Sequence, residues 1–265
     1  MINTLGASDL ARQDRPMDPR VAAALAPGGL RLAAQQIVDL DGRRVGWELL
    51  SRPRDGTRPD HLFEAARATG GEPELSGRVI ELTTAAAGTL GDLPVSLNLD
   101  PTLLGPLSAP IRRLARLLPG GLRLEIPETL PLDNPLLVAR TARGLGVGLV
   151  ADDLGAGLPR RSAELARLQL AAIKLDRGAL REAGSGRAQT AVFAAYLELA
   201  LRLAPVVVVE GVEEKRELRL LRTVAAGRRE VYAQGYLFGP PQPLAPTIHG
   251  VPDPLPATPP PRRQS

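Results

Sequence analysis

Val206-Val207-Val208-Val209 is followed directly by Glu210, and this short stretch is a strong indication of the fold class. Four β-branched apolar residues in a row are typical of a strand that is buried on both faces, as in a parallel sheet covered by helices. A carboxylate at the end of such a strand is costly unless it is paired or binds a cation. The stretch therefore predicts a covered parallel sheet with a polar site at the carboxyl ends of its strands.

Similar apolar runs occur throughout the chain before and after this strand. Seven more strands are predicted, at residues 30–38, 45–51, 95–99, 122–126, 148–152, 172–175 and 231–234. Most segments between them carry helical patterns rich in Ala, Leu, Arg and Glu, at residues 61–68, 74–87, 111–118, 135–144, 161–168, 188–203 and 213–225. Such alternation implies a parallel sheet with crossover helices. Eight strands in about 215 residues favour an α/β fold of the (β/α)8 TIM-like barrel type over an open sheet.

Polar side chains interrupt nearly every predicted strand close to its carboxyl end. They are Glu48, Asn98, Glu125, Asp152, Asp153, Lys174, Glu210 and Gln234. One such residue alone is more often a strand end that reaches solvent. In a parallel barrel, however, these ends converge on one mouth, where active sites are found. So many carboxylates can share a mouth only by binding cations, which lower their pKa values.

The composition limits which cations these are. The chain has no cysteine and only two histidines, His61 and His249, which excludes a zinc–thiolate site and a histidine-rich site. Oxygen ligands point to hard cations such as Mg²⁺ or Mn²⁺. Two such cations beside a lysine suit the hydrolysis of a phosphodiester by an activated water.

The charge and hydropathy of the chain limit which partners and which cellular location we expect for it. The net charge is +4 with both signs interspersed, so we expect no nucleic-acid polymer as partner. No stretch approaches the length of a membrane span, and the start of the chain lacks the apolar centre of a signal peptide, so we expect a cytoplasmic protein. Residues 1–28 are predicted as a flexible arm with at most a short helix at 21–25. Residues 29–245 are predicted as the folded domain and 246–265 as a disordered Pro-rich tail.

Several segments, in order, resemble motifs of the EAL-domain family of cyclic di-GMP phosphodiesterases. The signature Glu-Ala-Leu-x-Arg corresponds to Glu48-Leu49-Leu50-Ser51-Arg52, after an entry motif that we place at Gln36-Ile37-Val38-Asp39. The later matches are Asn98-Leu99-Asp100-Pro101, Glu125-Ile126-Pro127-Glu128, Asp152-Asp153, Lys174-Leu175-Asp176-Arg177, Glu210-Gly211-Val212-Glu213 and Gln234-Gly235-Tyr236-Leu237-Phe238. The resemblance covers residues 30–243, nearly the whole expected domain.

The resemblance implies a role for each matched residue. It implies two Mg²⁺ or Mn²⁺ ions held by Glu48, Asn98, Glu125, Asp152, Asp153 and Glu210. Lys174 and Gln234 would handle the attacking water, and Glu128 would brace the loop after the Asp pair. Arg52 would contact the phosphate of cyclic di-GMP, with Asp176 in the wall of the site and Pro241 against a base. It further implies a homodimer and leaves room for a regulatory protein partner.

Departures from the family pattern keep two functions open. The loop after the Asp pair has Leu154, Ala156 and Leu158 in place of an aromatic residue, a hydroxyl residue and a tyrosine. Loss of such supporting residues typically costs about 10–100-fold in metal affinity or activity. We therefore expect a phosphodiesterase that hydrolyses cyclic di-GMP to pGpG, with a weakly active or inactive receptor or interaction module as the alternative.

Overall fold

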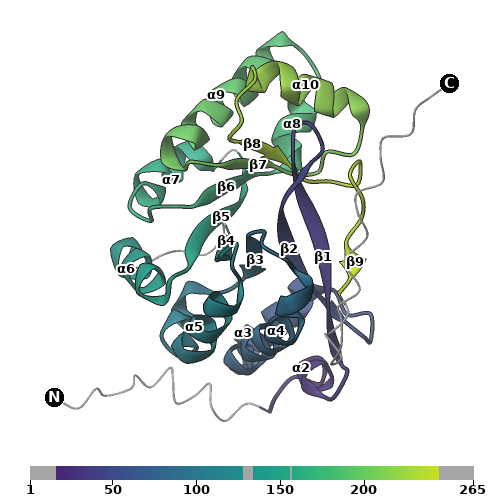
Figure 1. The fold of residues 1–265 in the computed structure, drawn as a ribbon, viewed down its shortest axis with the longest axis vertical. Helices are drawn as coiled ribbons and strands as arrows, with labels where there is room; N and C mark the ends of the chain where they lie inside the picture. The colour runs from purple at the N-terminus through teal and green to yellow at the C-terminus, as the bar shows by residue number, and fades with distance from the viewer. Residues whose placement is uncertain (1–15, 128–133, 156, 245–265) are drawn as a thin grey trace.

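Eight strands close into a barrel in the computed structural model, which describes residues 16–127, 134–155 and 157–244 (Figure 1). The barrel strands are β1 (Leu30–Asp39), β2 (Arg44–Pro53), β3 (Val95–Asn98), β4 (Leu122–Pro127), β5 (Gly148–Leu154), β6 (Ala172–Leu175), β7 (Val207–Val209) and β8 (Val231–Ala233). They follow one another in chain order around the ring, and β1 pairs with both β2 and β8. The predicted α/β barrel is confirmed.

Helices cover the outside of this barrel, because each crossover between parallel strands must return along the outer face of the sheet. They are α2 (Pro19–Leu25), α3 (Pro59–Thr69), α4 (Glu72–Ala86), α5 (Ser108–Leu117), α6 (Pro135–Leu145), α7 (Leu158–Leu165), α8 (Arg177–Ala183), α9 (Arg187–Leu203) and α10 (Lys215–Ala225). Short 3-10 turns occupy Ala87–Thr89 and Pro101–Leu104. Figure 1 shows α3, α4 and α5 at one end of the molecule and α8, α9 and α10 at the other.

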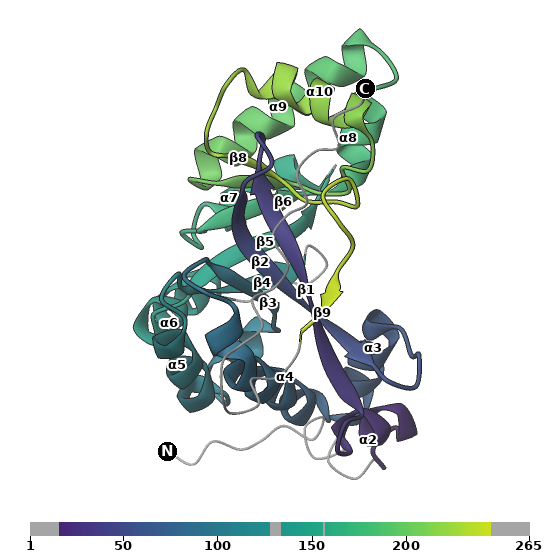
Figure 2. The same ribbon diagram turned by 45° about the vertical axis from the view of Figure 1, so that its right-hand side comes forward.

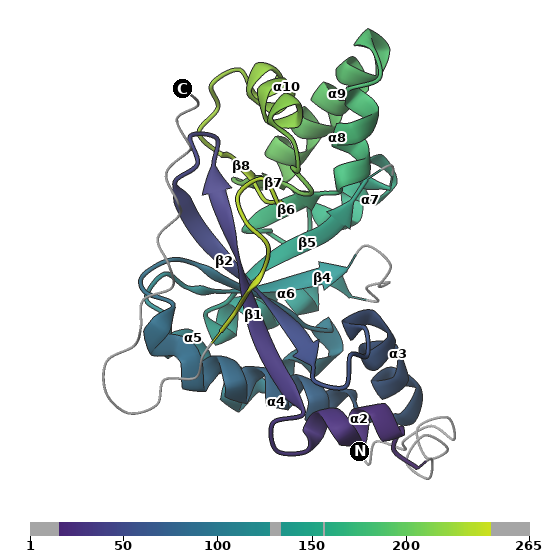
Figure 3. The ribbon, with the colours of Figure 1, turned by 90° about the vertical axis from the view of Figure 1, so that its right-hand side faces the viewer.

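The first strand departs from a fully parallel arrangement. β1 runs antiparallel to β2 and to β8, whereas all pairs from β2 through β8 are parallel. The turn at residues 40–43 joins β1 to β2, and it is far too short for a crossover helix. Arg222 of α10 donates to the carbonyl of Leu40 in this turn at 2.9 Å. Figure 3 shows the resulting long hairpin of β1 and β2. β9 (Gln242–Pro243) pairs with β1, beside which it lies in Figure 1.

The apolar residues of the strands divide between two places because successive side chains alternate. Outward residues such as Leu97, Leu124 and Val209 join one core with the covering helices. Val150, Ala172 and Val208 are equally buried but lie apart from that core, inside the barrel. Polar residues that share this inward alternation therefore project into the barrel interior.

Helix α2 lies within the segment expected as a flexible arm. Asp18 caps it by accepting from the Arg20 backbone N–H at 2.8 Å, and Val21 and Ala24 on its inner side are buried. It packs against α3 and α4, beside which it lies in Figure 2. The exact ends of the arm and of the tail stay predictions, and residues 245–265 lie outside the described residues.

Candidate metal centre at the carboxyl ends of the strands

A buried lysine forms the middle of the polar cluster in the barrel. Lys174 on β6 is 1% exposed, and its Nζ lies within ion-pair distance of four carboxylates. The distances from Nζ are 2.8 Å to Glu210, 2.9 Å to Asp152, 3.2 Å to Glu125 and 3.3 Å to Glu48. These carboxylates come from β2, β4, β5 and the end of β7, so barrel closure brings together residues up to 162 positions apart.

Two overlapping groups of acidic side chains could each hold a metal ion. Glu48, Glu125 and Asp152 form one group, and Asp152, Asp153 and Glu210 form the other. Within each group one oxygen of every carboxylate lies within 4.8 Å of the others. Asp152 belongs to both groups and could therefore supply an oxygen ligand to each of them. Divalent ions prefer such all-oxygen sites.

Buried oxygens without a hydrogen-bond partner indicate that this cluster is suited to hard cations. Glu125 Oε1 is buried and accepts no hydrogen bond from any described residue. Asp152 Oδ1 lies 2.9 Å from Lys174 Nζ, but its geometry there is that of an ion pair and not of a hydrogen bond. Buried polar atoms without partners are rare in folded proteins, and a bound ion often satisfies them. The residues present therefore suit one or two divalent cations.

Burial and mutual repulsion shift the pKa values of this cluster. Burial, with the charge of Glu48 second, raises the pKa of Glu125 well above its usual range. Burial likewise raises the pKa of Glu210 to about 8, against the lowering effect of Lys174. Burial alone would lower the pKa of Lys174, but the surrounding carboxylates outweigh this effect and raise its pKa well above the usual value. More negative charge is thus gathered here than one lysine offsets.

The adjacent residues Asp152 and Asp153 both reach this mouth because the strand is irregular. Regular alternation would turn them to opposite faces. Asp153 instead has a φ of 56°, and the β5–β6 register shifts between Ala151 and Leu154. Positive φ is uncommon for residues other than glycine, although aspartate tolerates it comparatively well. This local bulge is what places two successive carboxylates at one site.

Gln35 is a residue of the centre that the sequence analysis missed. It is 8% exposed, pairs with Glu48 in the β1–β2 register, and accepts from Gln234 Nε2 at 3.2 Å. Gln234 Nε2 also donates to Glu48. Our placement of the entry motif at Gln36 was one residue off, because Gln36 faces the other way and donates to the Phe238 carbonyl. The alternation of Ala33, Gln35 and Ile37 on the inward face could have identified Gln35.

Two clefts open from the centre to the surface. The first, of about 510 Å³, includes Asn98, Asp152, Asp153 and Arg52 in its walls. The second, of about 320 Å³, includes Glu48, Asp153, Glu210 and Gln234. Asp176 lines the second cleft and caps α8 by accepting from the Gly178 N–H at 2.7 Å. Most of the predicted site residues are thus gathered around one mouth.

Some of the expected contributors lie away from this mouth or outside the described residues. Pro241 is half-buried and lines neither cleft. Glu128 and Ala156 lie outside the described residues. Leu154 and Leu158, the other departures in the loop, are fully buried and join the outer core. Their apolar side chains therefore stabilise the fold around the Asp pair.

Comparison with known proteins gives a consistent result. A family model described as the EAL domain matches residues 19–241. The chain is 30% identical over 253 residues to the cyclic di-GMP phosphodiesterase NbdA of Pseudomonas aeruginosa, in an alignment that covers 89% of this chain and 32% of that protein. The chain thus spans about a third of the length of that relative.

Solved structures match the fold along most of the chain. PaMucR phosphodiesterase in complex with c-di-GMP has a TM-score of 0.71 and 26% identity, covering 84% of this chain and 96% of that one. Klebsiella pneumoniae BlrP1 with manganese and cyclic di-GMP has a TM-score of 0.70 and 26% identity, covering 89% and 64%. Among the described residues, no helix is long and apolar enough to cross a membrane.

Proposed function

The chain belongs to the EAL domain family, and we propose that it is a phosphodiesterase that hydrolyses cyclic di-GMP to pGpG with two divalent cations. The observation that carries the proposal is the pair of acidic groups that share Asp152 at the barrel mouth. It is supported by relatives named as cyclic di-GMP phosphodiesterases and by BlrP1, solved with manganese and this ligand.

Different residues of the chain would have different roles in this reaction. Glu48, Glu125, Asp152, Asp153 and Glu210 would hold the cations, with Asn98 as a further oxygen ligand at the edge of the larger cleft. When bound, Mg²⁺ or Mn²⁺ would neutralise phosphate charge and make a water more acidic. This chemistry requires carboxylates held in place by a rigid frame, which the barrel strands provide.

Other side chains would position the phosphodiester and the water. Arg52 lines the larger cleft beside Asp152 and Asp153, where its guanidinium can donate to a phosphate oxygen. Lys174 would place a positive charge at the reacting phosphate and orient the water by donating from Nζ. Gln234, held by Gln35 and Glu48, would help to hold the water. Asp176 would complete the wall of the smaller cleft.

A receptor that binds cyclic di-GMP without hydrolysing it is the second candidate. Leu154 and Leu158 favour it, because two buried aliphatic residues replace groups that the family places in the loop after the Asp pair. The complete set of acidic ligands favours the enzyme. The bracing role of Glu128, contact of Pro241 with a base, a homodimer, a regulatory partner and a cytoplasmic location also remain proposals.

Incubation of the purified chain with cyclic di-GMP and Mn²⁺, followed by chromatography, separates these functions. Appearance of pGpG supports the enzyme, and its loss in Glu48→Ala supports the metal assignment. Binding in a calorimeter without any pGpG would establish the receptor. Binding of neither cation nor cyclic di-GMP would overturn both.

A further inference from the structure

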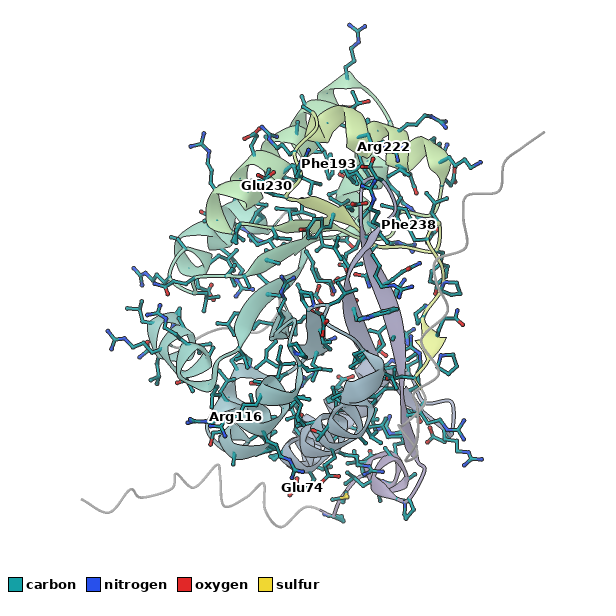
Figure 4. The ribbon with its side chains drawn as sticks, in the orientation of Figure 1. Glu74, Arg116, Phe193, Arg222, Glu230 and Phe238 are labelled. Atoms are coloured by element: carbon teal, nitrogen blue, oxygen red, sulfur yellow. The ribbon has the colours of Figure 1, made fainter. Side chains whose placement is uncertain are left out.

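Helix α5 presents a strongly positive face that the proposed chemistry does not use. Its charged residues are Arg112, Arg113 and Arg116, and all three are exposed. Among the described residues none of them has an ion-pair or hydrogen-bond partner. Figure 4 shows Arg116 at the outer side of α5, away from the barrel. The three guanidinium groups are therefore free to meet a partner from outside.

These charges lie close enough together on the helix to repel one another. Arg112 and Arg116 are four positions apart, and Arg113 and Arg116 are three apart, so both pairs are neighbours on the helix surface. Like charges at these spacings destabilise a helix. By contrast, Arg78 of α4 and Arg181 of α8 each lie beside a carboxylate, at 3.1 and 2.7 Å. The α5 arginines thus weaken their own helix in the described structure.

The neighbouring helix adds to this charge instead of offsetting it. α6 contacts α5, beside which it lies in Figure 1. Its charged residues are Arg140 and Arg143, both exposed and also without an ion pair to any described residue. The five arginines of these two helices exceed the net charge of the whole chain, which is +4. Positive charge is therefore concentrated on this side of the molecule, where it attracts an anionic partner.

A groove beside the α5 arginines indicates the shape of such a partner. It has a volume of about 470 Å³ and is lined by Ser108, Ala109, Arg112, Arg113, Arg116 and Leu117. Leu117 is 45% exposed, so the groove combines an apolar side chain with guanidinium groups. A concave surface of this kind suits an extended peptide segment better than the flat surface of a membrane. One exposed leucine also gives α5 too little apolar surface to enter a lipid layer.

We propose that the groove on α5 binds an acidic segment of a partner protein. Arg112, Arg113 and Arg116 pair with carboxylates of that segment, and Leu117 packs against an apolar side chain between them. Each guanidinium can donate two parallel hydrogen bonds to one carboxylate, which suits Asp and Glu side chains. The groove shares no residue with either cleft at the barrel mouth, so the inference does not depend on the proposed function.

Fluorescence anisotropy on the full chain tests the proposal with a labelled peptide in which Glu-Glu-Leu is repeated. One matched peptide repeats Gln-Gln-Leu and lacks the charge, and another repeats Glu-Glu-Gly and lacks the apolar side chain. The variant combines Arg112→Glu with Arg116→Glu, and circular dichroism verifies its fold. The control combines Arg187→Glu with Arg219→Glu, because these exposed arginines of α9 and α10 also have no ion pair with a described residue.

The wild type should bind the Glu-Glu-Leu peptide at least about 10-fold more tightly than the Gln-Gln-Leu peptide, because hydrogen bonds between charged groups are the strong ones. The Arg112→Glu and Arg116→Glu variant should lose at least about 10-fold in affinity, and the control should change by less than about twofold. Equal binding of the Glu-Glu-Gly peptide would remove Leu117 from the site.

Equal binding of the charged and uncharged peptides, or equal losses in the two double variants, would overturn the proposal. Vesicles of phosphatidylserine and duplex DNA serve as competing anions in the same assay. Binding of either one more tightly than the Glu-Glu-Leu peptide, with the loss confined to the Arg112→Glu and Arg116→Glu variant, would assign this face to a membrane or a nucleic acid and would also overturn it.

Discussion

Gln35 and Gln36 are neighbours on β1, but strand alternation gives them different environments. Gln35 faces the barrel interior and accepts from Gln234, which in turn donates to Glu48. Gln36 faces outward and holds the backbone near Phe238. Residues that hold a metal ligand or a water in place act on the reaction through orientation. At the scale of single residues, orientation therefore decides which of two identical side chains belongs to the site.

Gln35→Ala should lower the turnover of cyclic di-GMP by roughly 10–100-fold, because Gln234 and Glu48 lose the group that orients them. Steady-state hydrolysis in Mn²⁺ measures the effect, with circular dichroism to verify the fold. Gln36→Ala on the opposite face is the control and should change turnover by less than about twofold. Equal losses in the two variants would show that Gln35 has no special position.

Glu72→Gln should make the chain more stable at neutral and alkaline pH. The pKa of Glu72 is raised from 4.5 to about 7 by burial and by Asp100, so between these values the folded chain binds more protons than the unfolded chain. Its stability therefore falls as the pH rises through this window. A glutamine cannot ionise, and it should gain roughly 1–3 kcal/mol over the wild type at pH 8.

The gain should be nearly lost at pH 4, where the carboxyl of the wild type is protonated in the folded state and mostly protonated in the unfolded state. Urea unfolding of both proteins at pH 4, 6 and 8 provides the measurement. Glu74→Gln, on the exposed side of the same helix, should track the wild type throughout. A gain of the same size at all three pH values would contradict ionisation of Glu72 as its cause.

Helix α2 shows how a short element supports the site from a distance. Its buried residues pack on α3 and α4, the two helices that carry Phe63, Arg67 and Glu72 into the larger cleft. A Cβ atom added to Gly71 would lie only 3.2 Å from Val21 Cγ1. Helix α2 therefore closely approaches Gly71, which directly precedes α4. Seven residues are too few for a stable isolated helix, so packing and the Asp18 cap maintain it.

Val21→Ala should therefore lower the free energy of unfolding by roughly 1–3 kcal/mol, between the usual costs of losing one and three buried carbons. Thermal or urea unfolding measures this. Ala22→Gln, on the exposed side of the same helix, is the control and should shift stability by less than about 0.5 kcal/mol. Stability unchanged by Val21→Ala would mean that α2 does not pack on α3 and α4 in solution.

Barrel closure is the feature of the whole molecule that creates the centre. The antiparallel β1 fills the last position between β8 and β2, and this places Gln35 next to Gln234 and Glu48. Lys174 then lies among carboxylates from four positions around the ring. Because these carboxylates come from so many strands, we expect the stability of the barrel to depend on whether their negative charge is neutralised.

Lys174→Met should destabilise the whole barrel by roughly 3–5 kcal/mol in the presence of a chelator, because three buried carboxylates and the half-buried Glu210 lose their common cation. Added Mn²⁺ should restore part of the loss, since it supplies positive charge to the same oxygens. Differential scanning calorimetry with and without Mn²⁺ measures both effects. Lys215→Met on the surface should match the wild type, and equal melting temperatures of all three proteins in chelator would contradict the prediction.

Local patterns were enough to predict the strand positions, the barrel class and most of the acidic, amide and lysine residues that lie at the mouth, because apolar runs and their polar interruptions are local properties of the chain. The reversed direction of β1, the inward turn of Gln35, the backbone bulge at Asp153 and the place of the buried Glu72 in the wall of the larger cleft emerge only in the folded chain. These features depend on dihedral angles and on contacts between distant segments. Alternation along one strand gives a side chain two possible faces, and only closure of the barrel decides which of them is the inside.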